Sequence, residues 1–155
     1  MIGARNGFPA DMAEENVALS PKGWVARQTR KILETGTTEG VEVTGRPIVL
    51  LTLKGAKSGK LRYTPVMRVE HGGAYAVVAS KGGALEHPTW YHNIKAHPEF
   101  PLQDGTRTRT YTAREVSGEE RAAWWERAVE AFPPYAEYQT RTDREIPVFV
   151  LEPAE

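Results

Sequence analysis

The chain has 155 residues, of which 40% are hydrophobic and 26% charged, and its 20 basic and 20 acidic side chains give a formal net charge of zero. This length and composition suit one globular domain and argue against a disordered chain. A zero net charge argues against a general binder of polyanions, so any anion site must come from a local excess of basic residues. The chain has no cysteine, which excludes disulfides, thiolate metal sites, iron–sulfur clusters and a cysteine nucleophile.

The N-terminal part of the chain is rich in glycine, alanine and acidic residues. We therefore expect residues 1–19 to be flexible and residues 20–155 to form a single domain. The sequence shows neither the apolar core of a signal peptide nor the roughly 20 apolar residues of a membrane span. It predicts a cytoplasmic protein.

A first helix is predicted over residues 20–34, because Ser20-Pro21 is typical of an N-cap and a first helical position. Trp24 and Ile32 lie near one face of this helix. The remainder is made basic by Lys22, Arg27 and Arg30. Packing on the rest of the domain explains this pattern, and so does a helix resting on an anionic membrane surface with Trp24 and Ile32 inserted. Residues 35–44 are typical of a linker.

Three strands are predicted next. Pro47–Leu53 is short, apolar and β-branched, as in a strand buried on both faces. Arg62–His71 is a second strand, in which Pro65 indicates a sheet edge or a bulge. Gly72-Gly73 is a strong turn signal, so Ala74–Ser80 is predicted to return as a third strand.

A helix over Pro88–His97 and a hairpin follow. Asp104-Gly105 marks the turn of this hairpin, between strands 99–103 and 106–114. Arg107 and Arg109 alternate with threonines on the second of these strands, a pattern typical of a solvated basic ridge.

The last helix is predicted to run from Ser117 to Phe132. Ser117 and Glu120 form an S-x-x-E capping box, and Pro133-Pro134 ends the helix. Its expected apolar stripe consists of Ala122, Trp125, Val129 and Phe132. A final strand is predicted over residues 146–152. Hairpin-connected strands with few helices indicate an antiparallel α+β or small-barrel domain.

The segment between the first two strands carries an unusual local charge. Residues 54–62 contain no carboxylate and four cations, namely Lys54, Lys57, Lys60 and Arg62. The two glycines allow backbone N–H groups to turn toward one point, and Ser58 adds a hydroxyl donor. This pattern predicts either a site for a phosphate or carboxylate or a solvated hairpin tip. It does not match a phosphate-binding Walker A loop.

The stretch G-A-K-S-G-K-L-R-Y-T-P (Gly55–Pro65) resembles the signature loop of the deazaflavin-dependent nitroreductase family. Three further segments resemble this family in the same order: Val77–Gly83, Pro88–Pro98 and Tyr138–Leu151. The resemblance covers about residues 20–152. It implies a split antiparallel β-barrel with an N-terminal helix and two or three connecting helices. It also implies coenzyme F-420, an 8-hydroxy-5-deazaflavin with a phosphate and a polyglutamate tail.

The resemblance also suggests roles for individual residues. It places the phosphate on Lys57, Ser58, Gly59, Lys60 and Arg62, with Lys54 nearby. The other expected coenzyme contacts are Thr64, Pro65, Ala79, Ser80, Lys81, Trp90, Tyr91 and Asn93. Tyr135 and Tyr138 are expected to line the substrate pocket, and Ser80 and Tyr138 are the candidate proton donors. Where some members of that family are expected to have a further tyrosine, one turn after Tyr138, this chain has Arg141, a departure that bears on its substrate preference.

The implied reaction is hydride transfer from reduced F-420 to a quinone, an enone or a nitro compound. The alternatives are an FMN-dependent oxidoreductase on the same barrel, a non-enzymatic F-420 carrier and a binder of single-stranded nucleic acid. The lack of a broad basic surface argues against the last. His87, His92 and His97 are five residues apart and would not share a helix face, so no metal site is expected.

Overall fold

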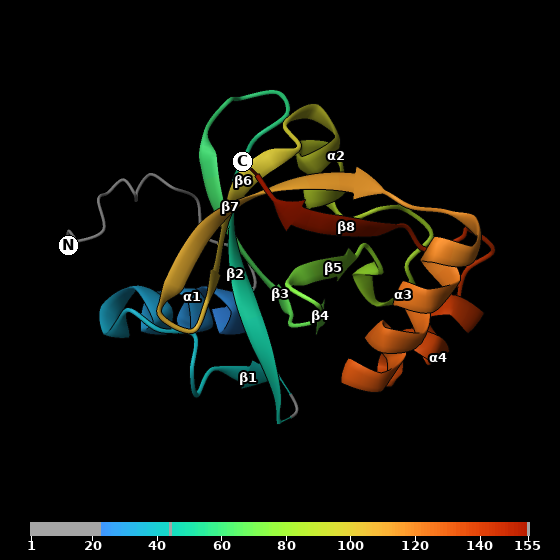
Figure 1. Ribbon diagram of the computed structural model, residues 1–155, viewed down its shortest axis with the longest axis horizontal. Helices are drawn as coiled ribbons and strands as arrows, with labels where there is room; N and C mark the ends of the chain where they lie inside the picture. The colour runs from blue at the N-terminus through green and yellow to red at the C-terminus, as the bar shows by residue number, and fades with distance from the viewer. Residues whose placement is uncertain (1–22, 44, 155) are drawn as a thin grey trace.

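The computed structural model describes residues 23–43 and 45–154 (Figure 1). The predicted segment 1–19 and the predicted cap Ser20-Pro21 lie outside these residues. The strands are β1 (Glu42–Val43), β2 (Arg46–Lys54), β3 (Leu61–Met67), β4 (Glu70–His71), β5 (Ala74–Val78), β6 (Glu99–Asp104), β7 (Arg107–Glu115) and β8 (Val148–Pro153). The helices are α1 (Gly23–Thr35), the short 3-10 helix η3 (Lys81–Gly83), α2 (Thr89–Ala96), α3 (Gly118–Ala131) and α4 (Pro134–Thr140).

The strands form one antiparallel sheet that curls into a half-barrel (Figure 1). Its strand order is β1-β2-β6-β7-β8-β5-β4, and β3 pairs with β2 off this path. Leu50 of β2 lies opposite Pro65 of β3 on one side and Gln103 of β6 on the other. Among the described strands β3 pairs with β2 alone, which suits a proline that has no N–H to donate. The predicted α+β antiparallel fold and the edge position of Pro65 are confirmed.

The hydrophobic core lies on both faces of the sheet. Along β2, Leu50 belongs to one cluster and its neighbour Leu51 to the other, because successive side chains of a strand point to opposite faces. Ile32 of α1 and Trp124 of α3 cover the first face, and Ile94 of α2 covers the second. The prediction of a strand buried on both faces is therefore confirmed for β2.

The buried face of α1 excludes part of the membrane hypothesis. Ile32 is only 1% exposed and belongs to the core, together with the buried Ala26 and Thr29, because α1 packs on β3. The prediction that Ile32 inserts into a lipid surface is wrong, and the side chain of Trp24 lies outside what the structure describes. None of the described helices is long and apolar enough to cross a membrane.

The apolar stripe of α3 matches the prediction in part: Phe132 is buried as predicted, whereas Trp124 and Ala128 lie deeper than the predicted Trp125 and Val129. Trp124, Ala128 and Phe132 are buried, whereas Ala122 is exposed and Trp125 is partly buried. Because two tryptophans are adjacent, the sequence does not show which face of the helix is buried. The contacts of α3 with β5, β8 and α4 select Trp124 for the core.

The predicted capping box of α3 does not form. Ser117 is the N-cap residue by position, but its side chain makes no cap hydrogen bond. Glu120 instead accepts two hydrogen bonds from the guanidinium of Arg114, at 2.9 and 2.7 Å. The guanidinium gives this carboxylate two charge-assisted hydrogen bonds where the capping box would give it one, which explains why Glu120 turns away from the helix end.

Two predicted boundaries also change. The predicted linker ends in β1, which pairs with the start of β2 through Glu42↔Pro47 and Val43↔Arg46. A strand of two residues is too short to show alternation in the sequence. The predicted strand 62–71 divides into β3 and β4, and the buried Val69 lies between them.

Candidate functional site

The basic loop joins β2 to β3 as a tight, closed turn. The N–H of Gly55 donates to the carbonyl of Lys60 at 2.8 Å, and the N–H of Gly59 donates to the carbonyl of Gly55 at 3.0 Å. A Cβ atom on Gly55 would lie 2.6 Å from Oγ of Ser58, so a larger residue here would displace the Ser58 hydroxyl. Gly59 has a φ of +72°, which glycine adopts without strain.

This loop presents unpaired donors and positive charge to solvent. Lys54, Lys57 and Lys60 are exposed, and none of the loop's four cations forms an ion pair with a described carboxylate. The N–H groups of Lys57 and Ser58 have no acceptor among the described residues. Oγ of Ser58 accepts the N–H of Lys60 at 3.1 Å, which leaves its own hydrogen available. The predicted anion-binding loop therefore has the donors that a phosphate requires.

Helix α2 holds the loop in place through Asn93. This side chain is only 5% exposed, and its Oδ1 accepts the N–H of Ala56 at 2.9 Å. The bond satisfies a buried polar group and ties the helix to the loop beside it (Figure 1). Asn93 was predicted as a coenzyme contact, and the structure places its amide oxygen on the loop itself.

Two aromatic residues precede Asn93 on α2. Trp90 and Tyr91 are partly buried against the core. The hydroxyl of Tyr91 donates to Glu115 at 3.1 Å, and its ring stacks on the His87 ring with 4.2 Å between centroids. Burial, assisted by Glu115, raises the pKa of Tyr91, so this phenol stays neutral.

The turn after β5 has a strained backbone. Lys81, Gly82 and Gly83 have φ angles of +47°, +65° and +83°, and Lys81 is the one residue of the three with a side chain. Such angles are costly for residues other than glycine and occur often at functional sites. Ser80, just before the turn, is 7% exposed, and its hydroxyl has no partner in the described part of the chain.

Arg144 fastens this turn, and sequence reasoning missed it. Its guanidinium donates to the carbonyls of Ala84 (2.9 Å), Ala79 (3.2 Å) and Ser80 (2.8 Å). A further contact joins it to Nδ1 of His87 at 3.1 Å. No described carboxylate pairs with Arg144, and burial lowers its pKa. The sequence hinted at Arg144 only because this residue lies in the Tyr138–Leu151 segment, which resembles the deazaflavin-dependent family.

The contact with Arg144 determines the protonation of His87. A guanidinium only donates hydrogen bonds, so Nδ1 of His87 must be the unprotonated, accepting nitrogen. Burial and the charge of Arg144 lower the pKa of His87, which keeps the ring neutral. Through its stacking on Tyr91, His87 links the turn to α2.

Helix α4 packs directly on the turn. A Cβ atom on Gly83 would lie 2.5 Å from the carbonyl oxygen of Tyr138, so only glycine allows this approach. The side chain of Tyr138 is half-buried, and its hydroxyl bonds to no described residue. The guanidinium of Arg141 lies 5.3 Å from the centre of the Tyr138 ring and donates to the carbonyl of Gly82 at 3.4 Å.

Tyr135 lies deeper than its predicted role in substrate binding suggests. It is 6% exposed and belongs to the core, with its ring centroid 5.0 Å from that of Phe132. Burial raises its pKa.

Thr64 and Pro65, predicted coenzyme contacts, lie half-buried on β3. Within the described ranges, no three His, Asp or Glu side chains are grouped to hold a metal ion.

The predicted site residues thus form two groups. The first is the basic loop with Asn93, and the second is the turn at Ser80 with Tyr138 and Arg141. Tyr91, His87 and Arg144 connect the two groups through hydrogen bonds and stacking. The first group holds exposed cations and free N–H groups, and the second holds the unpaired hydroxyls of Ser80 and Tyr138.

Comparison with known families decides among the alternatives. The profile of the F420H(2)-dependent quinone reductase family matches residues 24–153. The chain belongs to this family. The predicted deazaflavin-dependent oxidoreductase is confirmed, and the family is named for quinones, one of the three acceptor classes that the resemblance implied.

Two relatives from Mycobacterium tuberculosis carry similar names. A putative F420H(2)-dependent quinone reductase is 36% identical over 107 residues, which cover 69% of this chain and 90% of the relative. An F420H(2)-dependent quinone reductase is 40% identical over 108 residues, which cover 68% of this chain and 72% of that protein.

Solved structures confirm the split-barrel fold. A structure of an F420-H2 dependent reductase is 63% identical, with a TM-score of 0.66, and covers 73% of this chain and 100% of its own. A structure described as a domain-swapped dimer is also 63% identical, with a TM-score of 0.68, and covers 86% of this chain and 100% of its own.

Proposed function

We propose that this member of the family reduces a quinone with reduced coenzyme F-420, whose phosphate binds to residues 54–62. One observation carries the proposal. The loop has four cations and two free backbone N–H groups without a described counter-ion, in a chain whose net charge is zero. The coenzyme, when bound, supplies the two electrons and the hydrogen that the acceptor receives.

Each loop residue has a distinct role toward the phosphate. Lys57 and Lys60 act as point charges, while the planar guanidinium of Arg62 suits two phosphate oxygens at once. Ser58 adds a hydroxyl donor, and Gly59 allows the backbone to turn. Lys54, at the end of β2, adds a further positive charge beside the loop.

The remaining coenzyme contacts would border the deazaflavin ring. They are Thr64, Pro65, Ala79, Ser80, Lys81, Trp90, Tyr91 and Asn93. Because Tyr91 and Asn93 already bond to Glu115 and to Ala56, we expect them to shape the cleft rather than to bind the ring through their polar atoms. The hydroxyl of Ser80 is unpaired and remains available for the ring or the acceptor.

Tyr138 is the proposed proton donor to the acceptor oxygen. Its hydroxyl is unpaired within the described structure, and its backbone lies against Gly83 of the turn that follows β5. A donor at this place stabilises negative charge that develops on the oxygen of a quinone or an enone. Ser80 is the second candidate, and Tyr135 contributes to the wall of the substrate pocket.

We place this activity in the cytoplasm. Among the described residues of α1, a membrane-surface contact would depend on the exposed Arg27, Arg30 and Lys31, since Ile32 is buried. The acceptor is a small molecule, and a nitro compound is a further candidate.

A side-by-side titration tests the proposal. We expect F-420 to bind much more tightly than FMN, because the loop cations address both the phosphate and the glutamate tail. Equal or tighter binding of FMN would refute the choice of coenzyme. Tight binding of F-420 without consumption of its reduced form by quinone, enone or nitro acceptors would identify a carrier, and an oligonucleotide should not bind.

A further inference from the structure

A cavity of about 300 Å³ lies at the other end of β2 from the basic loop. Arg68, one of its lining residues, donates its backbone N–H to Pro47 at the start of β2, whereas the basic loop follows Lys54 at the end. Leu102, another lining residue, lies opposite Leu51 in the middle of β2, and none of the lining residues belongs to the loop. The cavity is therefore separate from the proposed phosphate site.

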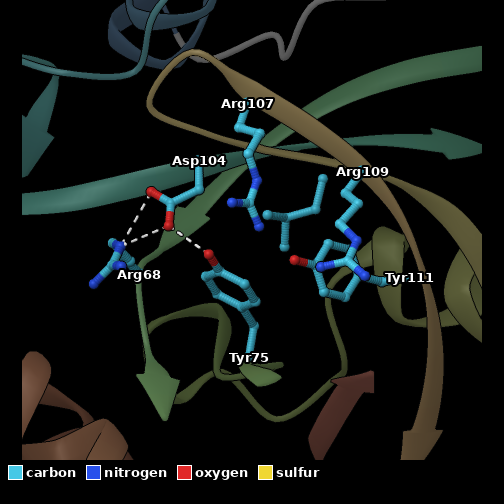
Figure 2. A pocket seen from close by; sticks show the side chains of 7 residues that line it. Arg68, Tyr75, Asp104, Arg107, Arg109 and Tyr111 are labelled. Atoms are coloured by element: carbon cyan, nitrogen blue, oxygen red, sulfur yellow. Dashed lines mark hydrogen bonds and ion pairs between the residues drawn. The ribbon is translucent and has the colours of Figure 1, made fainter. Parts of the chain in front are cut away.

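Two arginines enter this cavity from the inward face of β7. Tyr111 is 3% exposed and points into the core, and Arg107 and Arg109 lie on the same face because side chains alternate along a strand. The sequence predicted a solvated basic ridge here. Arg107 and Arg109 are indeed exposed, and both also line the cavity (Figure 2).

The expected counter-ion of these arginines is engaged elsewhere. Asp104 lies directly opposite Arg107 in the β6–β7 register, where opposite charges normally pair. Its two carboxylate oxygens instead accept Nε of Arg68 at 3.1 and 3.0 Å, and one of them also accepts the hydroxyl of Tyr75 (Figure 2). Arg107 and Arg109 are thus left without an ion pair among the described residues.

The wall of the cavity also supplies an uncharged donor. The Tyr111 ring packs edge-on against the Tyr75 ring, with 5.4 Å between centroids. Its hydroxyl bonds to none of the described residues and faces the same space as the guanidinium groups of Arg107 and Arg109 (Figure 2). Two like charges on one strand face repel each other, and a bound dianion would remove this repulsion.

We propose that this cavity binds a phosphate dianion, either free or as the monoester of a small organic group. Two guanidinium forks match the oxygens of a phosphate, and the Tyr111 hydroxyl adds a third donor. Asp104 shapes the site, because it neutralises Arg68 and leaves the other two arginines for the ligand. The volume lies at the lower end of the range for small-molecule pockets, which suits a compact ligand.

Calorimetric titration with inorganic phosphate and with phenyl phosphate, at constant ionic strength, tests this site. The Lys57→Ala/Lys60→Ala background weakens anion binding at the basic loop strongly, so the remaining phosphate binding reports on the cavity. We expect one phosphate per chain in this background, and at least tenfold weaker binding after Arg107→Gln/Arg109→Gln is added. Equal affinity for the two probes would indicate free phosphate, and tighter binding of phenyl phosphate would indicate a monoester.

A matched control separates the site from a general effect of charge. Arg27→Gln/Arg30→Gln removes the same two charges from exposed positions of α1 and should leave phosphate binding unchanged. Tyr111→Phe deletes one donor and should weaken binding severalfold without unfolding the protein. Unchanged binding after Arg107→Gln/Arg109→Gln, or an equal loss in the α1 control, would overturn the proposal.

Discussion

Tyr138 combines an unpaired hydroxyl with a position against the turn after β5. We predict that Tyr138→Phe lowers kcat with a quinone by about 10–100-fold, in line with the loss of one positioned donor. Affinity for F-420 should stay nearly intact, because the phosphate is held elsewhere. Steady-state kinetics and a coenzyme titration measure the two effects.

Tyr135→Phe is the matched control for this prediction. It removes the same atom from a tyrosine that lies in the core, so its effect should be weaker and fall mainly on KM. If Tyr138→Phe turns over quinone and nitro acceptors at the unmodified rate, the ring serves packing alone. Ser80 or water would then supply the proton.

Arg144 acts on the site through backbone carbonyls rather than through a ligand. Arg144→Gln should weaken F-420 binding and raise the pKa of His87, because the charge of Arg144 helps to keep that pKa low. Arg144→Lys retains the charge but not the planar fork, so it should restore the His87 pKa and leave coenzyme binding impaired. Histidine NMR titration and a coenzyme titration provide the two measurements. An unchanged His87 pKa in Arg144→Gln would contradict this account.

The direction of the pH effect follows from the lowered pKa of His87. At pH values above the ordinary histidine pKa of about 6.5, the His87 ring is neutral in both states and the fold has its full stability. As the pH falls below about 6.5, the unfolded chain binds a proton on this histidine more readily than the folded chain does. Stability is therefore lost as the pH falls through the lowered pKa of the folded state. The free energy of unfolding should therefore decrease under mildly acidic conditions.

At the scale of elements, the β2–β3 loop and α2 act together. Lys57→Ala/Lys60→Ala should weaken F-420 binding strongly and reduce its salt dependence, because it removes two of the four cations. The fold should hold, since both side chains are exposed and the loop's hydrogen bonds use backbone atoms, Ser58 and Asn93. Unchanged affinity would place the phosphate away from this loop. Thermal unfolding provides the control.

At the scale of the whole molecule, local patterns predicted what depends on near neighbours in the chain. The apolar run of β2, the Asp104-Gly105 hairpin and the charge excess of the basic loop were all visible in the sequence. The partners of Arg144 and Asp104 were not, because each is reached only when strands and helices distant in sequence meet. The same limit explains the phase of α3, where tertiary contacts chose between two adjacent tryptophans.

Gly83 restricts how this enzyme can change its choice of acceptor. The backbone of α4 rests on this glycine with no room for a single added carbon, so any side chain at position 83 would force α4 away from the turn. If the acceptor binds beside Tyr138, as proposed, exchanges of Tyr138 or Arg141 would reshape its pocket while keeping this backbone contact. Libraries aimed at new acceptors should vary these two positions and keep residue 83 as glycine.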